Sequence, residues 1–297
     1  MFTGLSAFPH SPLRDDVVDE SAYGVLIERL VAAGVDSITA LGSTGAYMYL
    51  DRAERRRVAT AAVRHAGSIP VMVGIGALRT SQVLRLADDA QEAGASAVLL
   101  APVTYQALGD DEVFGLFEDV TAGLSVPLVV YDNPGTTHVT FSDELYARIA
   151  ALPNVASIKI PGVPVDPAEA AARVRAIRDR IPTSVGVGVS GDSAAATGLN
   201  AGCDVWYSVI GGTLPETALR ISRAALSGDH ALATAESERL EPLWAVFRAY
   251  GSYRVTAAIG EILGLVAPDS LPRPVHGLTR EARTLVARLV DDLDLRA

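Results

Sequence analysis

Lys159 is the only lysine of this chain, in which all the other permanently cationic side chains are arginines. It lies within an apolar stretch with the composition of a β-strand, VASIKIPG at residues 155–162. Because burial of an ammonium group is costly, we expect its pKa to be lowered and its amine to be neutral. A neutral lysine amine condenses with ketones to a Schiff base, which stabilises the making or breaking of adjacent carbon–carbon bonds. The alternative is a side chain that extends to a surface carboxylate, a role that arginine serves equally well.

Tyr131 ends the preceding apolar stretch, PLVVYDNP at residues 127–134. Neighbouring parallel strands lie about 4.8 Å apart, so its phenol would point into the same cavity as the lysine. There it would relay protons to and from a substrate. The alternative is an aromatic ring that fills the interior and whose hydroxyl group is hydrogen-bonded.

Two glycine-containing motifs lie where other apolar stretches end. GSTG at residues 42–45 offers two hydroxyls and free backbone N–H groups, which suit a carboxylate, although a plain tight turn is an alternative. GVGVSG at 186–191 matches a dinucleotide-binding pattern, but its glycines fall within the expected strand rather than in the turn after it. We therefore expect these small residues to leave room beside the lysine. A phosphate site is a further alternative for a barrel, although neither of the last two strand-end loops holds a lysine or arginine.

The sequence predicts no metal, pyridoxal phosphate or nicotinamide cofactor. Its five histidines are scattered and form no H-x-H or H-x-x-x-H pair, which a metal-dependent aldolase would need. The single cysteine, Cys203, excludes an intrachain disulfide and fits a buried thiol in a reducing compartment.

Short apolar stretches alternate with longer segments of helical periodicity along the first 228 residues. The expected strands lie at 4–8, 37–42, 71–76, 97–102, 127–134, 155–161, 184–191 and 205–212. The expected helices lie near 19–33, 51–65, 80–93, 111–122, 142–151, 166–180 and 193–201, with an eighth from about residue 215. Capping signals begin several of them: Asp51 with Glu54, Thr80, Ser142, and Asp166 before Pro167.

Eight such units predict a (β/α)8 TIM barrel over residues 1–228. The strands are continuously apolar, which indicates burial on both faces of a parallel sheet. Residues 229–297 are purely helical in pattern, near 230–249, 252–264 and 279–295, and are expected to pack on the barrel as a C-terminal extension. Active sites of such barrels lie at the carboxyl ends of the strands, where Lys159, Tyr131 and GSTG all fall.

The overall composition favours a small ligand. With 49% hydrophobic residues, 20% charged residues and a net charge of −10, the chain has material for a large core and no basic excess for nucleic acid or an anionic membrane. Neither a signal peptide nor a membrane-spanning stretch is evident, so we expect a cytoplasmic protein.

Four stretches in order resemble the dihydrodipicolinate synthase and N-acetylneuraminate lyase family of class I aldolases and lyases. They are GSTG, YDNPGTT, SIKIPG and VSGDSAAATGLNAGCDVWYSVIGG, and the resemblance spans about residues 4–230. It implies a homotetramer in which Lys159 forms the Schiff base with pyruvate or another 2-keto acid. Tyr131 would be the proton shuttle, with Thr44 beside it, and Ser43 and Thr44 would hold the keto-acid carboxylate. The expected substrate-binding residues are Ser43, Thr44, Gly188, Ser190, Ile210, Tyr105 and Thr136.

Three departures from the family pattern concern the substrate. Ala46 stands where the family usually has a glutamate, and Thr136 where dihydrodipicolinate synthases carry an arginine for the second substrate's carboxylate. Tyr105 is offset from the tyrosine that reaches a neighbouring subunit. The leading hypothesis is thus a Schiff-base lyase of a 2-keto acid. The alternatives are dihydrodipicolinate synthase proper, against which Thr136 argues, and a keto-acid-binding homologue without turnover.

Overall fold

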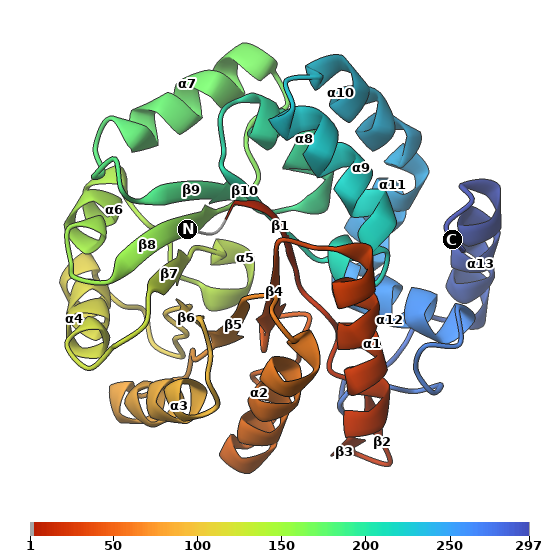
Figure 1. Cartoon of the computed structure of the whole chain (residues 1–297), viewed down its shortest axis with the longest axis horizontal. Helices are drawn as coiled ribbons and strands as arrows, with labels where there is room; N and C mark the ends of the chain where they lie inside the picture. The colour runs from red at the N-terminus through yellow and green to blue at the C-terminus, as the bar shows by residue number, and fades with distance from the viewer. Residues whose placement is uncertain (1–2, 297) are drawn as a thin grey trace.

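The computed structural model describes residues 3–296, and its centre is a closed barrel of eight parallel strands (Figure 1). Around the barrel the order is β1-β10-β9-β8-β7-β6-β5-β4, and β4 closes on β1. The strands are β1 Gly4–Ala7, β4 Ser37–Ala40, β5 Val71–Gly74, β6 Ala97–Leu100, β7 Leu128–Tyr131, β8 Val155–Ile160, β9 Gly186–Val189 and β10 Val205–Ser208. Each lies within the range expected from the sequence, so the predicted (β/α)8 barrel is confirmed. The polar residues that follow each apolar stretch belong to the loops.

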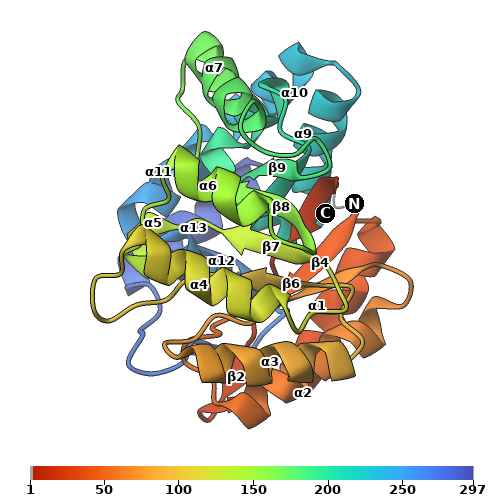
Figure 2. The same ribbon diagram turned by 90° about the vertical axis from the view of Figure 1, so that its left-hand side faces the viewer.

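Eight helices, one after each strand, form the outer layer seen in Figures 1 and 2. They are α1 Glu20–Ala33, α2 Arg52–Ala66, α3 Thr80–Glu92, α4 Asp110–Thr121, α6 Asp143–Ala150, α7 Pro167–Arg178, α8 Ala195–Asn200 and α9 Pro215–Leu226. Asp51 and Glu54 form the expected reciprocal capping box at α2. The capping prediction for Thr80 was wrong, because Thr80 is already helical and Arg79 precedes it as the cap without a side-chain bond.

Side chains along the strands alternate between two separate apolar layers, although almost all of them are hydrophobic. Met72, Leu99 and Val129 belong to a small cluster inside the barrel. Their neighbours Val73 and Val130 pack outward in the large core beneath the helices. This alternation follows from the two-residue period of a strand, which decides whether a residue faces the barrel interior or the helices.

The C-terminal extension consists of α10 His230–Arg239, α11 Glu241–Tyr250, α12 Ser252–Ile262 and α13 Arg280–Asp292. The single helix expected over 230–249 is therefore two helices, which meet at Leu240. Pro242 gives the reason, because proline is accepted in the first turn of a helix but not in its interior. α10 packs on α8 and α9, and α11 contacts η1 Asp192–Ala194, the turn after β9. The extension thus reaches the carboxyl ends of the barrel strands.

Four short elements were not expected from the sequence. β2 Leu13–Arg14 and β3 Val17–Val18 form a hairpin whose turn residues, Asp15 and Asp16, both have positive φ angles of 53° and 63°. Positive φ angles at both turn residues match the twist of the two strands in a hairpin with a two-residue loop. Aspartate adopts such angles more readily than most residues. The others are α5 Pro134–Thr137, after β7, and η2 Ile210–Gly212, after β10.

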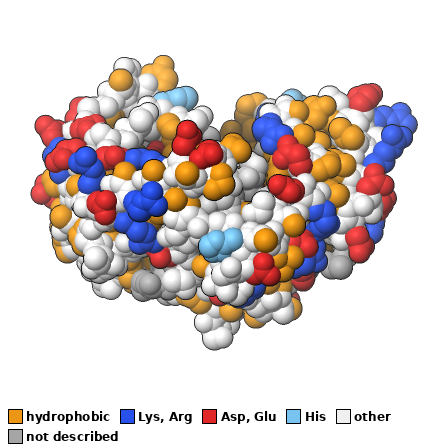
Figure 3. Space-filling model, turned by 90° about the horizontal axis from the view of Figure 1, so that it is seen from above, with side chains coloured by type: hydrophobic (Ala, Val, Ile, Leu, Met, Phe, Trp, Pro, Cys, Tyr) orange, Lys and Arg blue, Asp and Glu red, His pale blue; other side chains and the backbone are white. Residues whose placement is uncertain are grey.

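None of the helices in residues 3–296 has the length and apolar character needed to span a bilayer. On the face shown in Figure 3, acidic and basic side chains are interspersed, and the upper edge is hollowed between two raised parts. This face therefore presents no continuous basic surface of the kind that a nucleic acid would need.

Candidate active site

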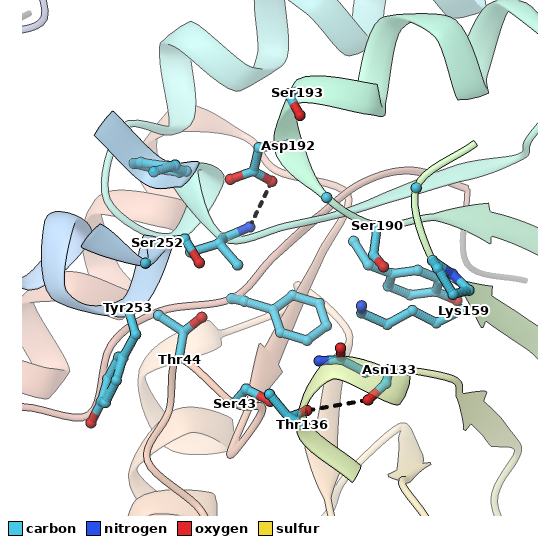
Figure 4. Close-up of a pocket in the computed structure, with 18 of the residues that line it drawn as sticks. Ser43, Thr44, Asn133, Thr136, Lys159, Ser190, Asp192, Ser193, Ser252 and Tyr253 are labelled. Atoms are coloured by element: carbon cyan, nitrogen blue, oxygen red, sulfur yellow. Dashed lines mark hydrogen bonds between the residues drawn. The ribbon is translucent and has the colours of Figure 1, made fainter. Parts of the chain in front are cut away.

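Lys159 lies near the carboxyl end of β8 and extends into a cavity of about 500 Å³ (Figure 4). The residue is only 4% exposed, and its Nζ lies 4.2 Å from the ring centroid of Tyr131 and 5.7 Å from that of Phe8. Burial lowers its pKa to about 7, although the carboxylates of Asp192 and Asp132 oppose the shift. A substantial fraction of the amine is therefore neutral at physiological pH, as nucleophilic attack requires.

The surroundings of this amine differ from those suggested by its neighbours in the sequence. Ile158 and Ile160 belong to the outer core beneath the helices, whereas Lys159 points into the barrel interior. Among residues 3–296 no carboxylate forms an ion pair with it, and its side chain does not reach the surface. The alternative of a surface-directed lysine is thus wrong. The amine is desolvated by the rings of Phe8 and of Tyr131 on the neighbouring strand, rather than by the adjacent isoleucines.

Tyr131 stands directly beside Lys159, because these two residues are paired in the register of β7 and β8. Its hydroxyl lies 3.0 Å from Ser43 Oγ and accepts a hydrogen bond of 2.9 Å from Asn133 Nδ2. Burial raises the pKa of this phenol, and the two hydrogen bonds only partly offset that effect. The group is therefore a neutral phenol, linked to a second hydroxyl through which a proton can pass.

The GSTG loop forms the wall of the cavity next to Tyr131. Ser43 and Thr44 both line the cavity, and within residues 3–296 neither backbone N–H is donated to a protein acceptor. Leu41 and Ala46, on either side of the motif, have φ angles of 57° and 59°, which are unfavourable for residues other than glycine. The loop is thus held in a strained conformation that leaves two amides and two hydroxyls for an anionic group.

Asp192 is a residue of the cavity wall whose importance sequence reasoning missed. It is 6% exposed and accepts four hydrogen bonds, from Trp206 Nε1, Ser208 Oγ and the backbone N–H groups of Val209 and Ile210. Burial raises its pKa to about 6 even though all four bonds favour the carboxylate. It fixes the turn after β10, and of the two carboxylates that raise the pKa of Lys159 it has the larger effect. A buried aspartate after a strand was visible in the sequence, but its four partners were not.

The opposite rim of the cavity comes from the C-terminal extension, which the sequence did not connect with the site. The rim residues are Trp244, Phe247, Arg248, Gly251, Ser252 and Tyr253. They belong to α11, the beginning of α12 and the residue between them. The cluster WAVFRAYGSYR, rich in aromatic side chains, was the only signal in the sequence, and it is equally typical of helix packing.

Comparisons with known proteins identify a family that covers nearly the whole chain. The model of the "Dihydrodipicolinate synthetase family" matches residues 1–293. The chain belongs to this family. The resemblance noted in the sequence is therefore confirmed, and the protein is an enzyme, a lyase.

Among relatives in the dihydrodipicolinate synthetase family, the 4-hydroxy-tetrahydrodipicolinate synthase of Phenylobacterium zucineum is 31% identical over 99% of this chain and 98% of its own. A dihydrodipicolinate synthase structure from Agrobacterium tumefaciens is 44% identical, with a TM-score of 0.94 over 98% of both chains. The chloride-inhibited enzyme of Acinetobacter baumannii, solved with pyruvate, is 25% identical, with a TM-score of 0.89 over 99% of this chain and all of its own.

Most of the residues expected at this site line one cavity. They are Lys159, Tyr131, Ser43, Thr44, Ser190 and Thr136. Thr136 presents a hydroxyl at the position after β7, and Ser190 Oγ donates to the carbonyl of Ile160 at 2.7 Å. In Figure 4 the Lys159 side chain lies between Ser190 and Asn133, with Ser43 and Thr136 further along the wall.

Gly188, Ile210 and Tyr105 do not line this cavity. A Cβ atom at Gly188 would lie 2.3 Å from the ring of Tyr207, so the space beside the lysine is filled by that ring rather than by substrate. Ile210 is fully buried and contributes its N–H to Asp192. Tyr105 is 88% exposed on the loop after β6. The single chain thus places these three residues outside the cavity, and their role in substrate binding stays a prediction. A position at a strand end does not reveal which neighbouring side chain occupies the space.

Within residues 3–296 no three histidine, cysteine, aspartate or glutamate side chains come together as a potential metal site. The cavity itself contains a single carboxylate, Asp192, which already accepts four hydrogen bonds. The reactive groups that the cavity does present are an amine, a phenol and a row of hydroxyls.

Proposed function

We propose that this lyase forms a Schiff base between Lys159 and pyruvate or a related 2-keto acid, without a metal or organic cofactor. The observation that carries the proposal is the position of the chain's only lysine. Its amine is 4% exposed, has a pKa of about 7 and lies 4.2 Å from the ring of Tyr131. Burial thus provides a neutral nucleophile without the need for a separate base.

The neighbouring groups suggest how the reaction proceeds. The neutral amine attacks the C2 carbonyl and passes a proton to its oxygen, which gives a carbinolamine. The carbinolamine then expels hydroxide, which takes up a proton and leaves as water, so the imine nitrogen keeps its positive charge. The free N–H groups and hydroxyls of Ser43 and Thr44 are suited to the keto-acid carboxylate. The Tyr131 hydroxyl, hydrogen-bonded to Ser43, is suited to donate the proton that the departing hydroxide takes up. It is equally suited to exchange a proton with C3 of the keto acid or, in a longer keto acid, with the oxygen on C4.

The test is reduction of the imine with borohydride in the presence of pyruvate. Lysine amines other than Lys159 do not exist in this chain, so the only competing primary amine is the N-terminus. We expect irreversible inactivation and a single modified peptide that contains Lys159. The proposal fails if no adduct forms or if the adduct is confined to the N-terminus. Turnover of longer keto acids in the same preparation separates a lyase from a homologue that binds them unchanged.

Synthesis of 4-hydroxy-tetrahydrodipicolinate is the second candidate, because relatives at about 30% identity carry that name. Thr136 argues against it, since this side chain presents a hydroxyl rather than a guanidinium toward the cavity. A coupled assay with pyruvate and aspartate semialdehyde decides between the two. Robust turnover would establish the synthase, whereas trapping of pyruvate without condensation would support a different second substrate.

The protein is also proposed to be a cytoplasmic homotetramer. The side chains of Met48, Tyr49, Leu78 and Tyr105 are between 42% and 88% exposed, which leaves large apolar side chains available for contacts between subunits. Light scattering coupled to size-exclusion chromatography tests this, with a mass four times 31.1 kDa expected.

A further inference from the structure

The cavity is larger than pyruvate requires. If each of the six non-hydrogen atoms of pyruvate takes as much room as a water molecule in the liquid, about 30 Å³, the molecule fills at most about 180 Å³. The cavity measures about 500 Å³. More than half of it is therefore left for the part of the substrate beyond C3, and this part must lie toward the rim formed by α11 and α12.

The rim contains one cationic side chain, Arg248 of α11. Among the described residues that line the cavity, Lys159 is the only other cation, and it is assigned to the carbonyl carbon. Thr136, Ser193 and Ser252 add hydroxyls along the path, and Figure 4 shows Ser193 and Ser252 on the side away from Lys159. The free volume thus runs from the amine past hydroxyls toward the part of α11 that carries Arg248.

We propose that Arg248 is a specificity-determining residue, which binds a carboxylate at the end of the substrate opposite to the 2-keto acid group. The substrate would then be a 2-keto dicarboxylic acid, either bound as one molecule or formed in the cavity from a 2-keto acid and a second fragment that carries the other carboxylate. A guanidinium suits this task because its planar donors match the two oxygens of a carboxylate. The inference rests on the proposed Schiff-base function of Lys159.

Arg248 is paired with Glu241, which lies seven residues, or about two turns, earlier on α11. Both side chains are more than half exposed, at 57% and 58%, and such a pair is weak enough to exchange its carboxylate for another. Glu241 does not line the cavity, whereas Arg248 does. Glu241 therefore competes with the substrate for Arg248, and its removal should favour an anionic substrate.

Two probes that differ only in the terminal group test the proposal: 2-oxoadipate, with a terminal carboxylate, and 2-oxohexanoate, with a terminal methyl group. For each, the concentration that gives half-maximal borohydride trapping on Lys159 is measured, and the ratio of the two values is compared between variants. Arg248→Gln should raise the half-maximal concentration of 2-oxoadipate by about tenfold or more and leave that of 2-oxohexanoate nearly unchanged. Glu241→Gln should lower the value for 2-oxoadipate.

Arg296→Gln is the matched control, because Arg296 forms a similarly exposed pair with Asp291, neither residue lines the cavity, and the substitution should leave the ratio unchanged. Pyruvate trapping should be equal in all four proteins. An Arg248→Gln variant that traps pyruvate normally but keeps the wild-type ratio overturns the role of Arg248 alone. Absence of trapping by any keto acid in the wild type overturns the Schiff-base function itself, so the two failures are distinguishable.

Discussion

The floor and the rim of the cavity are built in different ways. The floor consists of barrel residues at the ends of β4, β7 and β8, where Ser43, Tyr131 and Lys159 are connected by short contacts and largely removed from water. The rim comes from α11 and α12 of the C-terminal extension, and its Arg248 is more than half exposed. Burial shifts the pKa values of both Lys159 and Tyr131 at the floor.

This difference suits the floor to the chemical reaction and the rim to selection among substrates. Shifting a pKa by several units requires removal of water, which the closed barrel provides for its interior side chains. Selection among substrates requires contacts with the part of the ligand that varies, and the helical extension reaches the cavity from outside the barrel. Substitutions at the floor should therefore affect all keto acids alike, whereas those at the rim should affect them unequally.

The largest effect is expected from Lys159→Met, which keeps the volume of the side chain and removes the amine. Turnover should fall by at least about a thousandfold, and borohydride trapping at this position should disappear for every keto acid. Trapping is measured by mass spectrometry of the intact protein. The melting temperature serves as the control and should not fall, because a buried amine is replaced by an apolar group. Retention of activity in this variant would contradict the assignment of the floor.

Tyr131→Phe should lower kcat by about a hundredfold or more, because proton transfer by a positioned side chain contributes factors of this size. The KM for the keto acid should change little, since the ring is kept and Ser43 and Thr44 remain in place. Steady-state kinetics with several keto acids gives the separation between kcat and KM. Ser43→Ala, which removes only the hydrogen-bonding partner of the phenol, is the milder comparison. A loss limited to one substrate would show that Tyr131 acts in selection instead.

The pH dependence should show a change near pH 7. Below that value Lys159 is protonated in the folded protein, so the rate of imine formation should fall about tenfold per pH unit. Reductive trapping of pyruvate with cyanoborohydride between about pH 5 and 9 measures it. A rate of imine formation that keeps rising to pH 10 would show that the pKa of Lys159 is not lowered.

The same pKa shift predicts a pH-dependent stability. Between about pH 7 and 10.5 the amine is protonated in the unfolded chain and neutral in the folded one, so the unfolded state binds more protons. The contribution of Lys159 to the free energy of unfolding should therefore rise with pH across this window. On acidification it should be lost by the time the pH has fallen through 7. Urea titrations at several pH values measure it, with Lys159→Met as the control that lacks this slope.

The smallest effect is expected at the rim. Ser252→Ala removes one hydroxyl from the cavity wall and should raise the KM for long hydroxylated keto acids by a factor of about two to five, the range for a single neutral hydrogen bond. Trapping of pyruvate, which does not extend to α12, should be unchanged and is measured in parallel. An equal loss of pyruvate trapping in this variant would contradict the distinction between floor and rim.

The floor was predictable from the sequence to the extent that it depends on strand periodicity. Lys159, Tyr131, Ser43 and Thr44 all follow or end apolar stretches, and parallel strands bring such positions to one end of a barrel. Gly188 shows the limit of this reasoning, because the space above it is taken by Tyr207 from the next strand. The boundary between α10 and α11 at Leu240 was not predicted, because the residues on both sides keep a helical pattern. Pro242 was the signal for it in the sequence.

The rim was not predictable in the same way. Trp244, Phe247 and Arg248 lie about 90 residues after Lys159 in a segment whose periodicity indicates only an amphipathic helix. The contact of α11 with η1, and with it the convergence of these side chains on the cavity, depends on how the extension docks.

The sequence by itself determined the order of eight strands and helices, the candidate nucleophile and the strand that carries it, because these depend on composition and on periods of two and 3.6 residues. Only the tertiary structure decided that the amine is desolvated by Phe8 and Tyr131, that Asp192 is held by four donors, and that α11 closes the cavity. These features arise between residues distant in the chain, whose approach is fixed by closure of the barrel and by packing of the extension upon it.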